Sequence, residues 1–475
     1  MVEDSSANLI INALAGTGKT STLKLIDKVG PEPMLYLAFN KRIVTEAEAD
    51  RKASYEDQSI LSFSDTTEIR TFNSLGHRIW AQATGYKLVL NPKKNSDLLR
   101  EAIYDRPKRL HSEAFSEFFE ITSAIALAKS LGYVPEGKFP NAKRLTDRLG
   151  LEGRLDGTLS DLAWELLEET LLTSIKASYG GAIDYDDQIY MPALFGGTFP
   201  NFPLVVVDEG QDLNPCNHAM LRKLRRSRII TVGDSGQSIY AFRGAVTEGM
   251  ETLRQTFEAT AADLTVSFRC PEAIVRAVHW HRPQMKWVKG GGRAAKILNP
   301  NSSVLTANSV IICRNNAPLF KLAFSLLNHG HGVNVHGSDI GPRVIAIMRK
   351  LGDESMSRTS TLSAIDGWLS EKLAKQSSSA LDLADCMRVF ARHGNTLSAA
   401  ISYAESLFKQ KGTIQLLTGH KAKGLEWDRV FHLDPHLCRD DEQDRNLRYV
   451  ITTRSKDTLY EIDGREIKWP NDHPH

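Results

Sequence analysis

Short apolar runs recur along this chain in two groups, and longer amphipathic stretches separate them. The runs lie at residues 8–12, 34–39, 204–207 and 229–232 in the first half, and at 309–313, 412–418, 429–433 and 458–462 in the second. Continuous apolar runs are typical of strands buried on both faces of a parallel sheet, with helices covering those faces. The pattern therefore predicts an α/β fold with two parallel-sheet cores.

Two stretches rich in helix-forming residues interrupt this pattern. The first lies between the early and late strands of the first group, with helices expected over 112–129 and 160–176 and a hinge at Gly180 and Gly181. The second carries a serine-rich loop at 377–379. We therefore expect the first core at 1–80 and 181–262, a helical insertion at 81–180, the second core at 263–340 and 411–475, and a reduced helical insertion at 341–410.

Composition limits the class of protein. A chain of 475 residues exceeds what one hydrophobic core supports, and its 41% hydrophobic and 24% charged residues are typical of soluble globular proteins. The net charge of +2 restricts any nucleic-acid binding to local patches. The five cysteines lack the spacing of zinc or redox sites. No signal peptide or membrane span is recognisable, so we expect a cytoplasmic protein, or a nucleoid or nuclear one.

A glycine-rich loop follows the first predicted strand. It reads Ala13-Leu14-Ala15-Gly16-Thr17-Gly18-Lys19-Thr20 and opens a helix that we expect to end near Gly30. In such a loop the backbone N–H groups surround phosphate, the lysine reaches the terminal phosphates and the threonine ligates Mg²⁺. The loop predicts a site for a nucleoside triphosphate, whereas a glycine turn that binds nothing is the alternative.

Acidic residues follow the apolar run at 204–207. The segment Asp208-Glu209-Gly210-Gln211-Asp212 stands at the carboxyl end of a predicted parallel strand, where open α/β sheets bind ligands. Asp208 is placed to hold magnesium and Glu209 to polarise an attacking water. Two solvated acids at a strand end are the alternative interpretation.

A third polar group follows the strand at 229–232. Gln237 stands where a side chain senses a terminal phosphate, and Tyr240 and Phe242 come shortly after it. Exposed aromatic rings stack on nucleic-acid bases without regard to sequence. For any single aromatic residue, a place in the core is an equally good alternative.

Taken together, these segments resemble the UvrD/Rep-like superfamily 1 DNA helicases, and most of all the F-box-helicase-like and phage-type members. The resemblance covers nearly the whole chain, because the motifs stand in the family's order at residues 13–20, 38–41, 71–76, 208–212, 233–245, 266–269, 311–315, 418–427 and 448–454. It implies two RecA-like cores that bind ATP and Mg²⁺. Departures from the family pattern include Ala13, where the loop usually has its first glycine, and Gly210, where the family more often has alanine. The segment at 39–41 is one residue shorter than the commoner pattern, and no glutamine precedes the loop to read adenine.

The resemblance implies a role for each matching residue. The resemblance assigns catalytic roles to Lys19, Glu209, Gln237, Arg269 and Arg454. It assigns magnesium binding to Thr20 and Asp208. Nucleotide binding falls to the loop from Ala13 to Thr20 together with Gln237, Arg269, Glu426 and Arg454. DNA binding falls to Phe39, Asn40, Lys41, Thr71, Phe72, Asn73, Tyr240, Phe242, Arg243, His420 and Trp427.

The expected function is that of an ATP-dependent single-stranded DNA translocase and 3′–5′ helicase. Its expected partners are single-stranded DNA, DNA junctions and proteins of replication, repair or recombination, and we expect a monomer. An ATP-switched remodeller that displaces proteins from DNA without unwinding it is the alternative. A small-molecule P-loop kinase is a third interpretation, which leaves Gln237 and the second sheet without a role.

Overall fold

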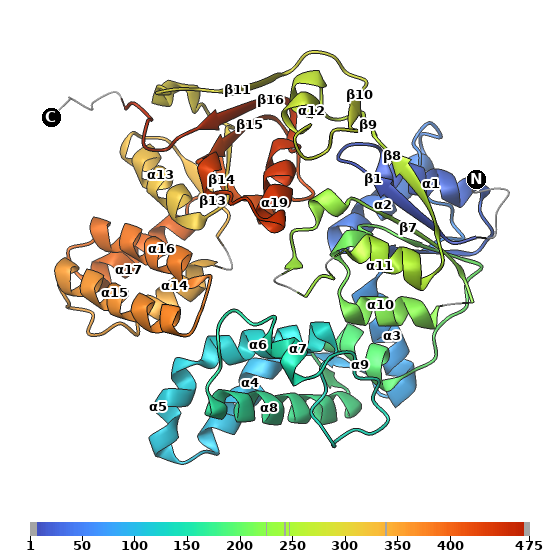
Figure 1. Cartoon of the computed structure of the whole chain (residues 1–475), viewed down its shortest axis with the longest axis horizontal. Helices are drawn as coiled ribbons and strands as arrows, with labels where there is room; N and C mark the ends of the chain where they lie inside the picture. Colours follow the sequence, from blue (N-terminus) through green and yellow to red (C-terminus); the bar gives the residue numbers. More distant parts are fainter. Residues whose placement is uncertain (1–6, 225, 242–243, 247, 338–339, 470–475) are drawn as a thin grey trace. The chain divides into compact units, whose positions relative to one another are not determined.

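The computed structural model describes residues 7–224, 226–241, 244–246, 248–337 and 340–469. The chain forms two compact units, one made of residues 1–14 and 18–264 and the other of residues 15–17 and 265–475 (Figure 1). Each unit contains a six-stranded sheet with helices around it, and every strand pair in both sheets is parallel. The predicted α/β class with two parallel-sheet cores is confirmed.

The sheet of the first unit places its most apolar strands in the centre. The strand order is β3 (Glu68–Thr71), β2 (Met34–Ala38), β6 (Leu204–Val207), β7 (Arg228–Gly233), β1 (Leu9–Ala13) and β8 (Thr260–Leu264). All residues of β2 and β6 are buried, whereas the edge strands β3 and β8 have no buried residue. Strand β7 pairs in parallel with both β6 and β1, so the carboxyl ends of these three strands lie side by side at the same end of the sheet.

Helices cover both faces of this sheet, and their ends carry recognisable caps. They are α1 (Lys19–Val29), α2 (Lys41–Ser54), α3 (Phe72–Thr84), α10 (Pro215–Lys223) and α11 (Gly249–Thr256). Asn40 caps α2, Thr71 caps α3 and Asn214 caps α10, because each side chain accepts a hydrogen bond from a free backbone N–H group of the first turn. Helix α1 ends at Gly30, as predicted.

A helical region extends from the first unit. It contains α4 (Lys94–Tyr104), α5 (Lys108–Ser116), α6 (Phe118–Leu131), α7 (Arg148–Glu152), α8 (Asp161–Tyr179) and α9 (Asp187–Phe195), with β4 (Val89–Leu90) pairing with β5 (Ala182–Ile183). The helix-forming stretch at 112–129 is divided between α5 and α6, which meet at Glu117. The buried side chain of Glu117 accepts a hydrogen bond from the Ser160 backbone at the start of α8, which holds the break in place.

A buried ionic network holds this helical region together. Lys129 of α6 is fully buried and contacts carboxylate oxygens of Asp184 at 2.6 Å and of Asp187 at 2.7 Å. Lys94 of α4 contacts Asp187 at 2.7 Å, and burial lowers the pKa of Lys94 against the attraction of that carboxylate. Each buried charge thus has an opposite partner, and the network ties α4 and α6 to the start of α9.

The sheet of the second unit repeats the arrangement. Its strand order is β11 (Arg293–Lys296), β16 (Ser455–Ile462), β15 (Trp427–Leu433), β12 (Val310–Cys313), β14 (Ile414–Thr418) and β13 (Val333–Val335). Beside it lie the short pair β9 (Val266–Ser267) and β10 (Lys286–Trp287) and the helices α12 (Glu272–Ala277), α13 (Asn316–Asn328), α18 (Gly419–Ala422) and α19 (Glu442–Thr452).

Four helices form the second insertion. They are α14 (Ile340–Met348), α15 (Arg358–Ala374), α16 (Ala380–His393) and α17 (Leu397–Phe408), and the loop predicted at 377–379 joins α15 to α16. Their apolar faces join the core of the second sheet through Phe320 and Phe390, whose ring centroids lie 5.4 Å apart. In the described part of the chain, every helix is too short or too polar to cross a membrane.

Candidate functional site

The glycine-rich loop connects β1 to α1 as predicted. Gly16 and Gly18 have φ angles of 72° and 80°, a left-handed conformation that glycine adopts without strain. This conformation turns the chain sharply, so that α1 begins at Lys19. Residues 15–17 group with the second unit, where the Tyr449 hydroxyl accepts a hydrogen bond from the Ala15 backbone at 2.9 Å.

The acidic segment lies beside the start of α1. Lys19 Nζ is 3.9 Å from a carboxylate oxygen of Glu209, and both side chains remain partly accessible. Asp208 is buried, and its carboxylate accepts hydrogen bonds from the Tyr36 hydroxyl and from the Glu209 backbone, each at 2.9 Å. Burial and the neighbouring Glu209 raise the pKa of Asp208 to about 6, while Lys19 opposes this shift. The structure thus brings together a cation, a half-exposed acid and a buried acid.

A chain of amide and carboxylate contacts connects this acidic segment to the end of β7. The Gln211 amide donates to Glu209, and its carbonyl oxygen accepts a hydrogen bond from the Asp234 backbone at 3.0 Å. The Gln237 amide donates to Asp234 at 2.8 Å. Gln237 is 3% exposed, so its position depends on Asp234 more than on solvent. Sequence reasoning singled out Gln237 and Glu209 but missed the two residues that connect them.

The glycine at position 210 has a steric cause. A Cβ atom on Gly210 would overlap the Cγ2 methyl of Thr231 and lie 3.1 Å from Met250 Sδ. Thr231 belongs to the central strand β7 and is fully buried, and its β-branched side chain has little rotamer freedom. An alanine at position 210 would therefore require Thr231 or its strand to shift.

The segment after Gln237 is held on two sides. The ring of Tyr240 is stacked on Phe39, with centroids 6.2 Å apart and an interplanar angle of 15°. The Arg154 guanidinium donates to the carbonyl oxygens of Ala241 at 3.0 Å and of Ala245 at 3.2 Å. Arg154 follows α7, so the helical region contacts the segment that carries Tyr240. The predicted DNA contacts Phe242 and Arg243 lie outside the described residues.

The remaining predicted DNA contacts of the first unit differ in exposure. Phe72 is 2% exposed and packs in the hydrophobic core, which is the alternative expected for any single aromatic residue. Asn40 and Lys41 are exposed at the start of α2, and Phe39 is half-buried. The Asn73 amide donates to the Tyr185 carbonyl oxygen at 2.7 Å, while the Thr71 hydroxyl caps α3.

In the second unit, the predicted nucleotide contacts are engaged with one another or with the backbone. Arg269 Nε lies 2.5 Å from a carboxylate oxygen of Glu426. Arg454 is 1% exposed, and its guanidinium donates to the carbonyl oxygens of Val450 at 2.9 Å and Leu425 at 3.2 Å. Arg454 therefore connects the end of α19 to the turn before β15. His420 and Trp427 are both half-buried.

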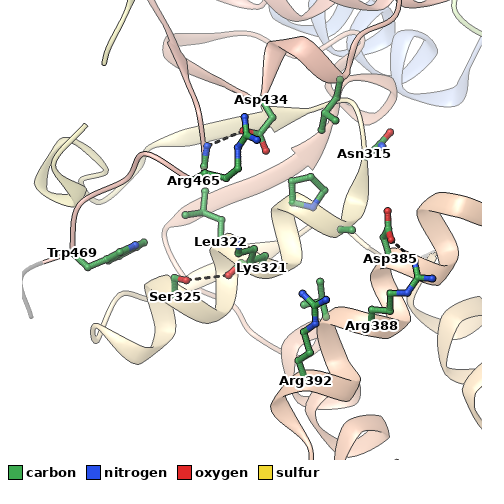
Figure 2. Close-up of a pocket in the computed structure, with 15 residues that line it drawn as sticks. Asn315, Lys321, Leu322, Ser325, Asp385, Arg388, Arg392, Asp434, Arg465 and Trp469 are labelled. Atoms are coloured by element: carbon green, nitrogen blue, oxygen red, sulfur yellow. Dashed lines mark hydrogen bonds and ion pairs between the residues drawn. The ribbon is translucent and has the colours of Figure 1, made fainter. Parts of the chain in front are cut away.

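A cavity of about 290 Å³ in the second unit lies apart from these residues. Figure 2 shows Arg388 and Arg392 extending from α16 toward α13, with Trp469 at another side of the cavity. Arg388 is paired with Asp366 at 2.6 Å and with Asp385 at 2.8 Å. The residues that line this cavity include none of those predicted to bind nucleotide or DNA.

Comparison with known proteins assigns the family. Residues 1–258, more than half of the chain, match the family model described as UvrD/REP helicase N-terminal domain. The chain belongs to the UvrD/Rep helicase family. Residues 413–460 match the UvrD-like helicase C-terminal domain. The resemblance seen in the ordered motifs is thus confirmed.

Curated relatives agree with this assignment. F-box DNA helicase protein 1 of Schizosaccharomyces pombe is 23% identical over 95% of this chain and 55% of its own length. F-box DNA helicase 1 of Gallus gallus is 24% identical over 94% of this chain and 46% of its own length. DNA helicase IV of Escherichia coli is 23% identical over 56% of this chain and 44% of its own length. The chain spans about half the length of these relatives.

Proposed function

We propose that this UvrD/Rep family member is an ATP-dependent single-stranded DNA translocase and 3′–5′ DNA helicase. The observation that carries the proposal is the grouping of Lys19, Glu209 and Asp208 where β1 and β6 end. A cation for phosphate, an acid that reaches solvent and a buried acid are the groups that hydrolysis of a nucleoside triphosphate requires. The polarity of movement is the one that the family resemblance implies.

The residues of the first unit suit a magnesium nucleotide. The Asp208 carboxylate and the Thr20 hydroxyl are oxygen donors of the kind that Mg²⁺ prefers. Once bound by them, Mg²⁺ would neutralise phosphate charge. Lys19 would contact the terminal phosphates, and Glu209 would orient the attacking water and accept its proton. Gln237 would report the presence of the terminal phosphate through Asp234, Gln211 and Glu209, which are already joined by hydrogen bonds.

Coupling to movement follows from the division of the proposed site. Lys19 and Glu209 belong to the first unit, whereas Arg269 and Arg454 belong to the second. In our proposal both arginines stabilise the transferred phosphate and Glu426 contacts the ribose. An arginine in that position contributes about 10³- to 10⁵-fold in rate. Hydrolysis then requires the units to close on the nucleotide, and product release lets them open, which moves the protein along a strand that both units grip.

Base stacking and backbone contacts would provide the grip on single-stranded DNA. Phe39 and Tyr240 form one aromatic pair with partial exposure, and Asn40 and Lys41 lie exposed next to Phe39. We assign further contacts, on family resemblance, to Thr71, Asn73, Phe242, Arg243, His420 and Trp427. Stacked bases each contribute about 1 to 3 kcal/mol and impose little sequence preference.

Site-directed variants test the assignment of the nucleotide site. Lys19→Ala and Glu209→Gln should each abolish ATP hydrolysis stimulated by single-stranded DNA, and normal turnover in either variant would contradict it. Arg454→Ala should retain nucleotide binding and lose hydrolysis. Because Arg454 is buried, Arg454→Lys and a melting curve accompany it, so that unfolding is recognised. Parallel assays with single-stranded DNA, single-stranded RNA and duplex establish which nucleic acid stimulates hydrolysis.

A second candidate function is an ATP-switched remodeller that displaces proteins from DNA without separating strands. The observation that favours it is the small second insertion, in which α14 to α17 pack into the core of the second sheet. A strand-displacement assay and a protein-displacement assay on the same preparation separate the two functions. Strand displacement supports the helicase, and protein displacement without it supports the remodeller.

A further inference from the structure

One segment of the second unit concentrates positive charge. Residues 276–296 contain six Lys or Arg, two His and no Asp or Glu, although the whole chain has a net charge of +2. The six are Arg276, Arg282, Lys286, Lys289, Arg293 and Lys296. A run of charge is usually a solvated face, so a ligand has to be argued from the side chains around it.

The segment folds into adjacent elements at one margin of the second unit. It begins at the end of α12, continues through β10 and ends in β11, which forms the edge of the second sheet (Figure 1). The guanidinium of Arg276 lies 5.0 Å from the ring centroid of Trp287, so α12 and β10 pack against each other. Arg276 of α12 thus lies beside the strand that carries Lys286.

Aromatic rings lie among these cations. Trp280 is 47% exposed, and the His281 ring is stacked on it with centroids 5.0 Å apart. The guanidinium of Arg448, from α19, lies 5.4 Å from the Trp280 ring centroid. An exposed indole flanked by cations can stack on a base while the cations contact the adjoining phosphates.

Several of the cations remain available to a ligand. Arg276 is paired with Glu272 and Arg448 with Glu461, each on the surface. In the described residues, no ion pair engages Lys286, Lys289 or Arg293, and all three side chains are exposed. Lys289 Nζ donates to the Lys456 carbonyl oxygen at 3.4 Å, and the Arg293 guanidinium lies 5.4 Å from the Tyr460 ring centroid. Neither contact pairs these charges with a carboxylate, so among the described residues both remain open to an anionic ligand.

We propose that this surface, formed by residues 276–296 and Arg448, is an additional binding site for single-stranded DNA. Trp280 stacks on an unpaired base, and Lys286, Lys289 and Arg293 neutralise phosphates. The site extends the contact between protein and strand beyond the residues to which the family resemblance assigns DNA binding. This inference rests on the proposed function.

Two variants test the site, and a third provides the control. Lys286→Glu with Lys289→Glu removes two phosphate contacts, and Trp280→Ala removes the stacking ring. Lys409→Glu with Lys411→Glu makes the same change of charge at two exposed lysines elsewhere in the second unit. The measurements are the affinity for oligo(dT) of about 40 nucleotides and of about 10, the latter within a single site size, over a range of salt concentrations.

The expected result depends on strand length. The long strand should bind the double lysine variant about tenfold more weakly at low salt, with the slope of log K against log salt reduced by about 0.7 for each lost phosphate contact. Trp280→Ala should weaken binding of the long strand without changing this slope. The short strand should bind all variants equally, with the same maximal stimulation of ATP hydrolysis, because the motif residues are intact.

Three outcomes would overturn the proposal: equal weakening in the control variant, unchanged affinity for the long strand, or a changed KM for ATP with unchanged DNA binding. If DNA fails to stimulate ATP hydrolysis in the unmodified protein, the proposed function is wrong. The binding measurements still decide on the surface in that case, because they require no hydrolysis.

Discussion

The hydroxyl of Tyr36 donates a hydrogen bond of 2.9 Å to the carboxylate of Asp208, across 172 residues of sequence. Tyr36 lies in β2 and Asp208 follows β6, its neighbour in the sheet, and both side chains are buried. Burial and the nearby Asp208 raise the pKa of Tyr36 well above its usual value, so its hydroxyl remains a donor at any physiological pH. Tyr36 therefore orients the acid that we propose as a magnesium ligand.

Replacing Tyr36 with phenylalanine should weaken magnesium binding. Loss of a group that orients a metal ligand typically costs about 10- to 100-fold in metal affinity. We expect the Mg²⁺ concentration that half-saturates ATP hydrolysis to rise by about tenfold. The control is Tyr190→Phe, which removes another buried tyrosine hydroxyl of the same unit, bonded to the Tyr133 carbonyl oxygen at 2.6 Å. An equal shift in both variants would contradict an orienting role for Tyr36.

Placing alanine at position 210 should impair both folding and hydrolysis. The added methyl overlaps Thr231 in a tightly packed strand, and overpacking of this kind costs about 1 to 3 kcal/mol. Displacement of the neighbouring Glu209 should lower kcat as well. Gly153→Ala is the matched control, because its new Cβ would lie 3.5 Å from the Leu149 carbonyl oxygen, an ordinary contact. Urea unfolding and ATPase assays check this, and unchanged stability of Gly210→Ala would refute the steric explanation.

Removing the Arg154 side chain should uncouple hydrolysis from DNA. Arg154 holds the backbone at Ala241 and Ala245, on the segment that carries Tyr240. Without it, we expect maximal DNA-stimulated hydrolysis to fall several-fold while the unstimulated rate stays the same. Arg100→Ala is the control in the same helical region, where an exposed arginine is paired with Asp97. A fall in the unstimulated rate of Arg154→Ala would indicate a general structural effect instead.

Acid should destabilise the first unit through a buried histidine. Burial lowers the pKa of His218 to about 4 from an ordinary value of 6.5. A lowered pKa in the folded state means that the unfolded chain binds the proton first as pH falls. The contribution of neutral His218 to the free energy of unfolding is therefore fully present above pH 6.5. It decreases by about 1.4 kcal/mol per pH unit as pH falls from 6.5 toward 4. His218→Leu should flatten this decrease in urea unfolding at several pH values, and an identical pH profile would show that another group is responsible.

The central strands and the chemical groups at their ends were predictable from local pattern. Strands β2 and β6 appear as continuous apolar runs because each is covered on both faces. The edge strands β3, β8 and β11 lacked this signal, since they have no buried residue. A strand appears in the sequence as a continuous apolar run only when both of its faces are buried. An edge strand without buried residues therefore gives little signal in the sequence.

The roles of particular side chains depended on partners far away in sequence. Phe72 follows Thr71 in a motif suited to DNA contact, yet the turn of α3 directs its ring into the core. In the sequence, nothing distinguishes Tyr36 from the other residues of an apolar strand. Its hydrogen bond to Asp208 exists because β2 and β6 are adjacent in the sheet.

By itself, the sequence determined the α/β class, the phosphate-binding loop, the acidic residues after β6 and the family. Each of these features follows from residue types at short spacing along the chain, and that spacing is the same whatever the tertiary arrangement. Tertiary structure alone decided that a Cβ at position 210 would overlap Thr231, that Arg154 supports the segment of Tyr240, and that Trp280 and Arg448 lie together. These contacts join residues that lie far apart in the sequence. The distance between such residues is set by strand order and helix packing, which a local sequence pattern does not contain.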